Sequence, residues 1–178
     1  YKKILNERLK LLKKNKVKII KDDCRNYKKL SITISKINPN FIYHLAAVAH
    51  ANVSNKDPFS TFDHSLRTLE NSLDASRSLK KLERFIFISS SMVYGNFTKK
   101  TVDEIDRCEP LGIYGGLKFA AEKMVIGYNQ VFNIPYNIIR PSALYGERCV
   151  SRRVVQIFIE NALKGNELLI NDDGKERL

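Results

Sequence analysis

Tyr114 and Lys118 stand four residues apart in the segment YGGLK, which reads as the start of a helix. Residues at i and i+4 lie on the same face of a helix, so the phenol and the ammonium would be neighbours. A free phenol has a pKa of about 10 and is a poor base at neutral pH, but a fixed positive charge beside it favours the phenolate. The spacing therefore indicates a base that could take a proton from an alcohol.

Three consecutive serines, Ser89 to Ser91, close an apolar segment that precedes the tyrosine. A serine hydroxyl at this place could hydrogen-bond the substrate oxygen on which Tyr114 acts. Ligands of open parallel sheets bind beyond the carboxyl ends of the strands, so we expect the serines and the tyrosine to face one crevice. Together they would form a proton-transfer unit for an alcohol that is being oxidised.

The elements that must position these residues follow from the hydrophobic pattern. Short apolar runs alternate with longer helical patterns, which is typical of β-α units that build a parallel sheet. The expected strands cover residues 17–20, 41–45, 85–89, 136–139 and 168–170. The expected helices cover residues 4–14, 27–37, 58–79, 114–132 and 154–164. The runs FIYHLAA and RFIFISSS are largely apolar rather than alternating, as expected for strands with helices on both faces. The pattern predicts an α/β fold.

Composition limits the partners. The chain has 178 residues, 43% hydrophobic and 28% charged, which suits a folded domain. Its 31 basic and 19 acidic residues give a net charge of +12, which favours anionic partners. The basic residues are scattered and no nucleic-acid-binding motif is found, so a nucleic-acid-binding module is the disfavoured alternative. The apolar stretch at 41–49 is too short to span a membrane.

The three cysteines, Cys24, Cys108 and Cys149, are far apart in the sequence. Their odd number and wide spacing suggest neither a disulfide framework nor a zinc site, so no metal is expected. This use of cysteine favours a cytoplasmic location.

Four motifs carry a resemblance to a known family. They are YHLAAVAH at residues 43–50, FIFISSSMVYG at 85–95, YGGLK at 114–118 and IIRPSALYG at 138–146. In this order and spacing the chain resembles the extended short-chain dehydrogenases, specifically the nucleotide-sugar epimerases and dehydratases. The resemblance implies a Rossmann-like, doubly wound parallel sheet, NAD as cofactor, a nucleotide-diphosphate sugar as substrate, and a homodimer formed through the long helices.

The resemblance also implies a role for each matching position. The catalytic residues would be Ser90, Tyr114 and Lys118, with Tyr114 as general base and Lys118 holding the nicotinamide ribose. Besides Tyr114 and Lys118, the cofactor would contact Asp23, Cys24, Leu45, Ala46, Ala47, Ser65 and Pro141. Besides Ser90 and Tyr114, the substrate would contact Ser91 and Ala143. Ser65 and Ala143 stand where many members carry asparagine, which leaves the identity of the sugar open.

The implied reaction is that of a UDP-glucose 4-epimerase. Tyr114 would remove a proton from a sugar hydroxyl while hydride passes to NAD, and the keto sugar would take the hydride back on its other face. Ser91 and Met92 stand where the 4,6-dehydratases carry an acidic pair, which argues against dehydration. A nucleotide-sugar reductase or dehydrogenase of the same fold, and an inactive remnant that binds a partner, remain alternatives.

The family's glycine-rich phosphate loop is not found in the sequence, nor is the residue that separates NAD from NADP. We therefore expect an internal fragment whose sheet is incomplete at both ends. Residues 1–150 would form a partial NAD-binding Rossmann domain that lacks its glycine-rich start. Residues 151–178 would begin the substrate-binding region.

Overall fold

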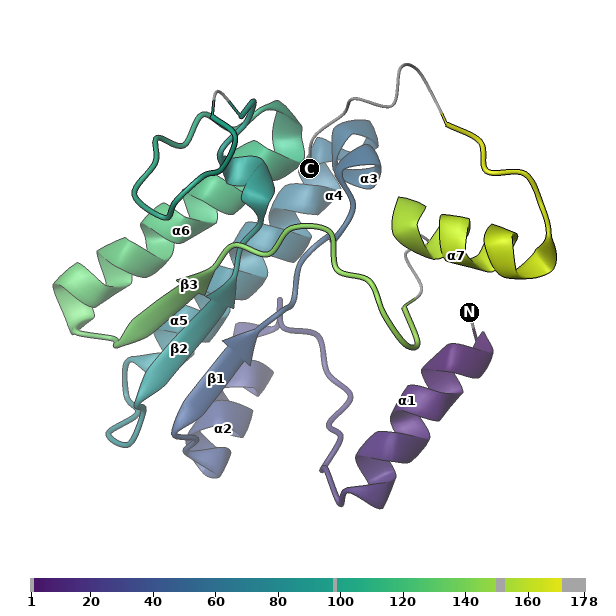
Figure 1. The fold of residues 1–178 in the computed structure, drawn as a ribbon. Coiled ribbons are helices and arrows are strands. Elements are labelled where there is room, and N and C mark those ends of the chain that lie inside the picture. The colour runs from purple at the N-terminus through teal and green to yellow at the C-terminus, as the bar shows by residue number, and fades with distance from the viewer. Residues whose placement is uncertain (1, 98, 150–152, 171–178) are drawn as a thin grey trace. The chain divides into compact units, whose positions relative to one another are not determined.

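The computed structural model describes residues 2–97, 99–149 and 153–170. The helices and strands follow one another as Figure 1 shows: α1 (Lys2–Lys14), α2 (Tyr27–Ile37), β1 (Phe41–His44), α3 (Ala51–Lys56), α4 (Pro58–Phe62), the π-helical turn η1 (Asp63–Arg67), α5 (Thr68–Ser76), β2 (Arg84–Ile88), the 3-10 turn η2 (Ser91–Val93), α6 (Gly112–Phe132), β3 (Tyr136–Ile139) and α7 (Val154–Lys164).

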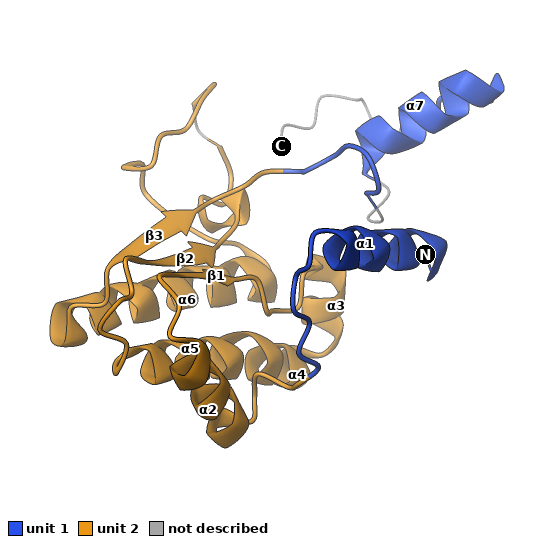
Figure 2. Ribbon diagram, turned by 90° about the horizontal axis from the view of Figure 1, so that it is seen from below, with its two compact units in different colours: residues 1–21, 143–178 blue, residues 22–142 orange. Residues whose placement is uncertain are grey.

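The chain divides into two compact units, one of residues 22–142 and one of residues 1–21 and 143–178 (Figure 2). The expected division after residue 150 concerns cofactor and substrate binding, which this partition does not test, so it stays a prediction. Residues 150–152 and 171–178 of the expected substrate-binding region and its border lie outside the described residues.

The sheet of the unit 22–142 has three parallel strands in the order β1-β2-β3. Their register pairs His44 with Phe87 and Phe87 with Ile138. The three arrows point the same way in Figure 1, so the carboxyl ends of the strands share one edge of the sheet. These strands confirm the expected parallel α/β arrangement, within one residue at each end.

The core of this unit lies between the sheet and the helices α5 and α6. Its fully buried side chains include Leu69, Leu73, Phe85, Phe87 and Val125. Figure 2 shows α2, α5 and α6 on one side of the strands. Helical cover on both faces is expected from the sequence, whereas the helices described in this unit cover one face. On the other face, Phe41 and Tyr43 remain 50% and 64% exposed.

Two expected strands are wrong. Residues 17–20 and 168–170 belong to no ladder of the sheet, and Val17, Ile19 and Ile20 are each nearly half exposed. A strand needs a neighbour for its backbone hydrogen bonds, and among the described residues the sheet consists of β1, β2 and β3. Apolar, β-branched composition favours an extended chain but does not supply that neighbour.

The segment expected as one helix over 58–79 contains a change of helical type. It begins at Pro58, where the Asp57 carboxylate accepts a hydrogen bond from the Ser60 N–H at 3.0 Å. The turn η1 then interrupts the α-helical pattern before α5 continues to Ser76. Single π turns of this kind are frequent at functional sites. Ser65 lies in this turn, and its hydroxyl contacts Val48 in the segment that follows β1.

The unit of residues 1–21 and 143–178 contains α1 and α7. The Arg8 guanidinium donates a hydrogen bond to the carbonyl oxygen of Arg148 at 2.6 Å, which ties α1 to the segment before α7. Helix α7 ends at Lys164, and the next residue, Gly165, has a φ of +69°, the left-handed conformation common just after a helix. Across the described residues, no helix has the length and apolar character that crossing a membrane requires.

Candidate functional site

Lys118 is a buried lysine, 9% exposed, on the face of α6 that meets the sheet. Its Nζ donates a hydrogen bond to the carbonyl oxygen of Ile88 at 2.7 Å, at the carboxyl end of β2. The same Nζ lies 5.9 Å from the ring centre of Tyr114, one turn earlier on the helix. Burial lowers the pKa of Lys118 to about 8, and the charge of Glu122 opposes this shift. The expected placement of the two side chains on one helix face is therefore confirmed.

The first turn of α6 is held by neighbours from outside the helix. The side-chain oxygen of Asn55, on α3, accepts a hydrogen bond from the Ile113 N–H at 3.3 Å and supplies the cap that Leu111 lacks. A Cβ at Gly115 would lie 2.8 Å from the carbonyl oxygen of Met92, so only glycine allows this approach to η2. Tyr114 therefore sits on a turn that α3 and η2 fix.

A small pocket opens between the end of β1, the segment of α4 and η1, and α6. Its lining residues are Ala47, Val48, Thr61, Ser65, Phe87, Tyr114, Leu117, Lys118 and Ala121. Two hydroxyls tie the chain after β1 to the neighbouring helix. Ser65 Oγ accepts from the Val48 N–H at 3.2 Å, and Thr68 Oγ1 donates to the carbonyl oxygen of Ala46 at 3.1 Å. The lining of the pocket thus includes the Lys118 ammonium, the phenol of Tyr114 and the aliphatic hydroxyls of Thr61 and Ser65.

The three serines have different partners. Ser89 Oγ donates to Glu122 Oε1 at 2.5 Å. Ser90 Oγ accepts from the Met92 N–H at 3.2 Å and caps η2, so its own proton can still be donated. Ser91 is half-buried, and its N–H donates to the carbonyl oxygen of Pro141 at 3.0 Å. Among the three, Ser90 combines a place at the strand end with a hydroxyl that is not committed to Glu122.

A buried ion pair lies beside these serines and was missed by the sequence reasoning. The Glu122 side chain is 2% exposed and the Arg140 side chain 18% exposed. Arg140 donates from Nε to Oε1 at 3.0 Å and from Nη2 to Oε2 at 2.8 Å. This bond pattern raises the pKa of Arg140. Glu122 follows Lys118 by four residues, and that spacing is the signal in the sequence that could have drawn attention to it.

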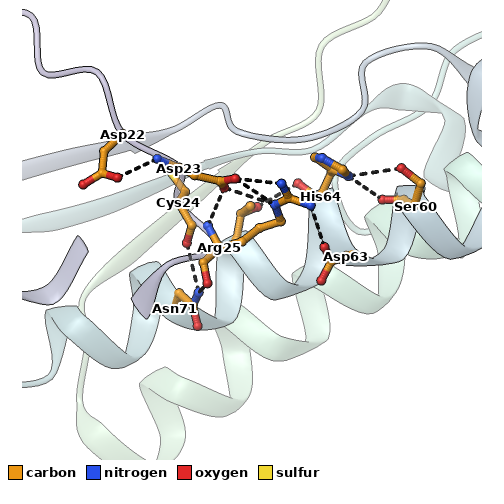
Figure 3. A network of polar contacts seen from close by, with 9 residues as sticks. Asp22, Asp23, Cys24, Arg25, Ser60, Asp63, His64 and Asn71 are labelled. Carbon is orange, nitrogen blue, oxygen red and sulfur yellow. Dashed lines mark hydrogen bonds and ion pairs between the residues drawn. The ribbon is translucent and has the colours of Figure 1, made fainter. Parts of the chain in front are cut away.

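Asp23 and Cys24, which are expected to contact the cofactor, belong to a network around Arg25 (Figure 3). Arg25 Nη2 bonds Asp23 Oδ2 at 2.7 Å, and Arg25 Nη1 bonds Asp63 Oδ2 on η1 at 2.9 Å. The Arg25 guanidinium holds the pKa of Asp23 at about 2. Asn71, on α5, donates to the carbonyl oxygens of Cys24 and Arg25, both at 2.9 Å. The segment 22–26 is thus anchored to two consecutive elements of one helical stretch.

The structure brings some of the expected residues together and leaves others apart. Ala47, Ser65, Tyr114 and Lys118 line the same pocket. Leu45, just after β1, is 69% exposed, and Pro141 contacts the serine segment through its carbonyl oxygen. Ala143 belongs to the other compact unit, so its place in the substrate site stays a prediction. The roles expected for all of these residues likewise stay predictions.

Comparison with known proteins assigns the family. The profile of the NAD dependent epimerase/dehydratase family matches residues 4–178. The chain belongs to this family. A Bacillus subtilis relative, described as an uncharacterized UDP-glucose epimerase, is 33% identical over 136 residues, which cover 76% of this chain and 42% of that protein.

Two solved structures of the family have the same fold. UDP-glucose 4-epimerase from Thermotoga maritima with UDP-glucose matches with a TM-score of 0.80 and 25% identity, over 88% of this chain and 52% of that one. UDP-glucuronic acid 4-epimerase from Bacillus cereus, in complex with UDP-glucuronic acid and NAD, matches with a TM-score of 0.77 and 28% identity, over 92% and 52%. The chain therefore spans about half the length of these family members, and the expected Rossmann-like fold is confirmed.

Proposed function

We propose that the protein at its natural length is an NAD-dependent nucleotide-sugar epimerase, similar in reaction to the UDP-glucose 4-epimerases. The observation that carries the proposal is the pairing of Tyr114 and Lys118 in one pocket at the carboxyl end of the sheet. Family membership and the UDP-sugar ligands of the two solved relatives support it.

The residues of the pocket fit the dinucleotide. Ala47 lines the pocket just after β1, and Ala46 precedes it in the sequence. Their small side chains suit a place where a cofactor must approach the backbone closely. The Lys118 ammonium and the Ser65 hydroxyl are donors of the kind that ribose hydroxyls accept. When bound, NAD supplies an acceptor and later a donor of hydride.

The chain's own residues would handle the proton and the charge. Tyr114 would take the proton from the sugar hydroxyl, and the Lys118 ammonium would favour the phenolate that does so. Ser90 would donate a hydrogen bond to the same sugar oxygen. After the sugar has presented its other face, Tyr114 would return the proton to that oxygen, so that neither proton nor hydride is consumed overall.

The test is the conversion of UDP-galactose to UDP-glucose by the purified protein at its natural length, followed by chromatography of the nucleotide sugars. Interconversion without accumulation of NADH is expected. Accumulation of NADH with an oxidised sugar would instead identify a dehydrogenase, and an absence of turnover with a panel of UDP-sugars would contradict the proposal. A cytoplasmic location and a homodimer through the long helices are also part of the proposal. Size-exclusion chromatography with light scattering gives the molar mass that tests the dimer.

A further inference from the structure

The Glu122 carboxylate accepts three hydrogen bonds that come from the ends of two different strands. Oε1 receives Ser89 Oγ and Arg140 Nε, and Oε2 receives Arg140 Nη2. Ser89 directly follows β2, and Arg140 directly follows β3. One buried side chain of α6 therefore joins the carboxyl ends of two neighbouring strands.

The residues next in sequence to these partners are a proposed catalytic serine and a proposed cofactor contact. Ser89 precedes Ser90, and Arg140 precedes Pro141. Glu122 itself lies one helical turn after Lys118, whose Nζ bonds the carbonyl oxygen of Ile88. A movement of Glu122 would therefore be transmitted to the serine and to the lysine through adjoining backbone.

Arg140 extends the same network to the segment after the serines. Its Nη1 donates to Tyr94 OH at 2.9 Å and to the carbonyl oxygen of Glu104 at 3.1 Å, and its guanidinium lies 4.9 Å from the Tyr94 ring centre. Tyr94 is buried and directly follows η2, the turn that Ser90 caps. The guanidinium that pairs with Glu122 therefore also bonds the residue that follows η2, the turn capped by Ser90.

A buried ion pair is a poor source of stability, because desolvation of two charges cancels much of their attraction and apolar packing often does as well. Such a pair can instead restrict a region to one arrangement, provided that every polar atom is satisfied. Both carboxylate oxygens of Glu122 and all three guanidinium nitrogens of Arg140 have partners here.

We propose that Glu122 is a positioning residue for the epimerase reaction, acting through Ser89 and Arg140 to hold Ser90 and Lys118 in place. This inference rests on the proposed function. If Glu122 only stabilised the fold, its loss would lower turnover no more than it lowers the amount of folded protein. A positioning residue lowers kcat even when the protein stays folded. The group need not touch the sugar or the cofactor.

The mildest test removes one of the three hydrogen bonds. Ser89→Ala deletes the hydroxyl but leaves the Glu122 and Arg140 pair intact. The matched control is Ser76→Ala, which removes an equally buried hydroxyl that donates to the carbonyl oxygen of Ser72 within α5. We expect Ser89→Ala to lower kcat about tenfold with KM for the UDP-sugar unchanged, because small misplacements of reacting groups cost turnover steeply. Ser76→Ala should leave both constants unchanged.

The second test separates positioning from bracing of the fold. Glu122→Gln leaves the Arg140 charge unpaired and should lower both Tm and kcat. The double variant Glu122→Gln with Arg140→Gln replaces the ion pair by two neutral amides and should regain Tm, while its kcat stays at least about tenfold below that of the unaltered protein. Recovery of kcat together with Tm, or an unchanged kcat in Ser89→Ala, would overturn the inference. An unaltered protein without epimerase activity would contradict the proposed function itself, and the inference would fall with it.

Discussion

Lys118 reaches from α6 to the end of β2, where its Nζ donates a 2.7 Å hydrogen bond to the carbonyl oxygen of Ile88. The bond fixes the ammonium in a mostly apolar setting, 5.2 Å from the ring centre of Phe87. It uses one of three donors, so the ammonium retains hydrogen-bonding capacity for a further acceptor. A positive charge is therefore in place beside Tyr114, which is the kind of preorganisation that lowers a reaction barrier.

Replacing Tyr114 with phenylalanine removes the proposed base but keeps the ring that lines the pocket. In the protein at its natural length we expect kcat to fall by about 10²- to 10⁴-fold, the usual contribution of a general acid or base. The affinity for NAD, measured by calorimetry, should change little. Tyr128→Phe, farther along α6, is the matched control and should keep full turnover. Comparable turnover in the two variants would exclude Tyr114 as the base.

The buried lysine should lower stability. Its pKa is lowered from 10.5 to about 8, which corresponds to about 3 kcal/mol at neutral pH. Loss of the bond to Ile88 costs about 1 kcal/mol, so Lys118→Met should raise the free energy of unfolding by about 1 to 2 kcal/mol while it abolishes turnover. Urea titration measures the change. Lys123→Met, at an exposed position of the same helix, should have little effect on stability or turnover.

The sign of the pH dependence follows from the direction of this shift. Because the pKa of Lys118 is lower in the folded protein, the unfolded chain binds the proton more tightly, and stability rises with pH wherever the two states differ in protonation. The penalty is complete below about pH 8 and fades between about 8 and 10.5. The stabilisation gained in Lys118→Met should therefore shrink over that interval. A gain that stays constant with pH would show that charge burial is not its cause.

His44 should make the fold sensitive to acid. Burial, and then the charge of Lys118, lowers its pKa from 6.5 to about 4, and the ring packs beside Phe85 and Phe87. The imidazole is neutral in the folded protein, so stability is lost as pH falls from about 6.5 towards 4, by about 3 kcal/mol in total. His44→Phe should flatten the dependence of the urea midpoint on pH in this interval.

The anchor of the segment 22–26 should affect cofactor binding more than chemistry. Arg25 connects Asp23 with Asp63, so Arg25→Gln should free the segment whose Asp23 and Cys24 we propose to contact the cofactor. We expect the Kd for NAD to rise about 5- to 10-fold, equivalent to about 1 kcal/mol. At saturating NAD, kcat should be unchanged. Arg77, which directly follows α5, forms an ion pair of the same type with Asp74; Arg77→Gln breaks this pair and should not alter the Kd.

Local patterns explain what the sequence could predict. The spacing of Tyr114 and Lys118 is a helical periodicity, and the apolar runs of β1, β2 and β3 identify strands without knowledge of their neighbours. Whether an extended run joins a sheet depends on partners elsewhere in the chain, which is why residues 17–20 were expected as a strand and are not one. The pattern of residues 58–79 likewise gives no sign of the π turn, because its α-helical periodicity is continuous.

Part of the candidate site depends on contacts between distant segments. The bonds of Glu122 to Ser89 and Arg140 join three elements, and neither partner has a spacing that points to the other. The same holds for Asn71, whose amide reaches the carbonyl oxygens of Cys24 and Arg25. Side chains that position a site are harder to find in a sequence than those that carry the chemistry. Their residue types are common, and their partners come together only in the folded chain.

The parallel ladder also constrains the order of folding. Phe41 pairs with Arg84, and Phe85 pairs with Tyr136, so each ladder joins residues separated by a long crossover that contains a helix. Loop closure must precede these pairings, and sheets built from such distant segments form slowly. During synthesis the central strand β2 gains its second neighbour only after Tyr136–Ile139 has left the ribosome. Until then, the edge of β2 that pairs with β3 has unpaired backbone groups that other nascent chains could pair with, and chaperone binding at this stage would protect the growing protein.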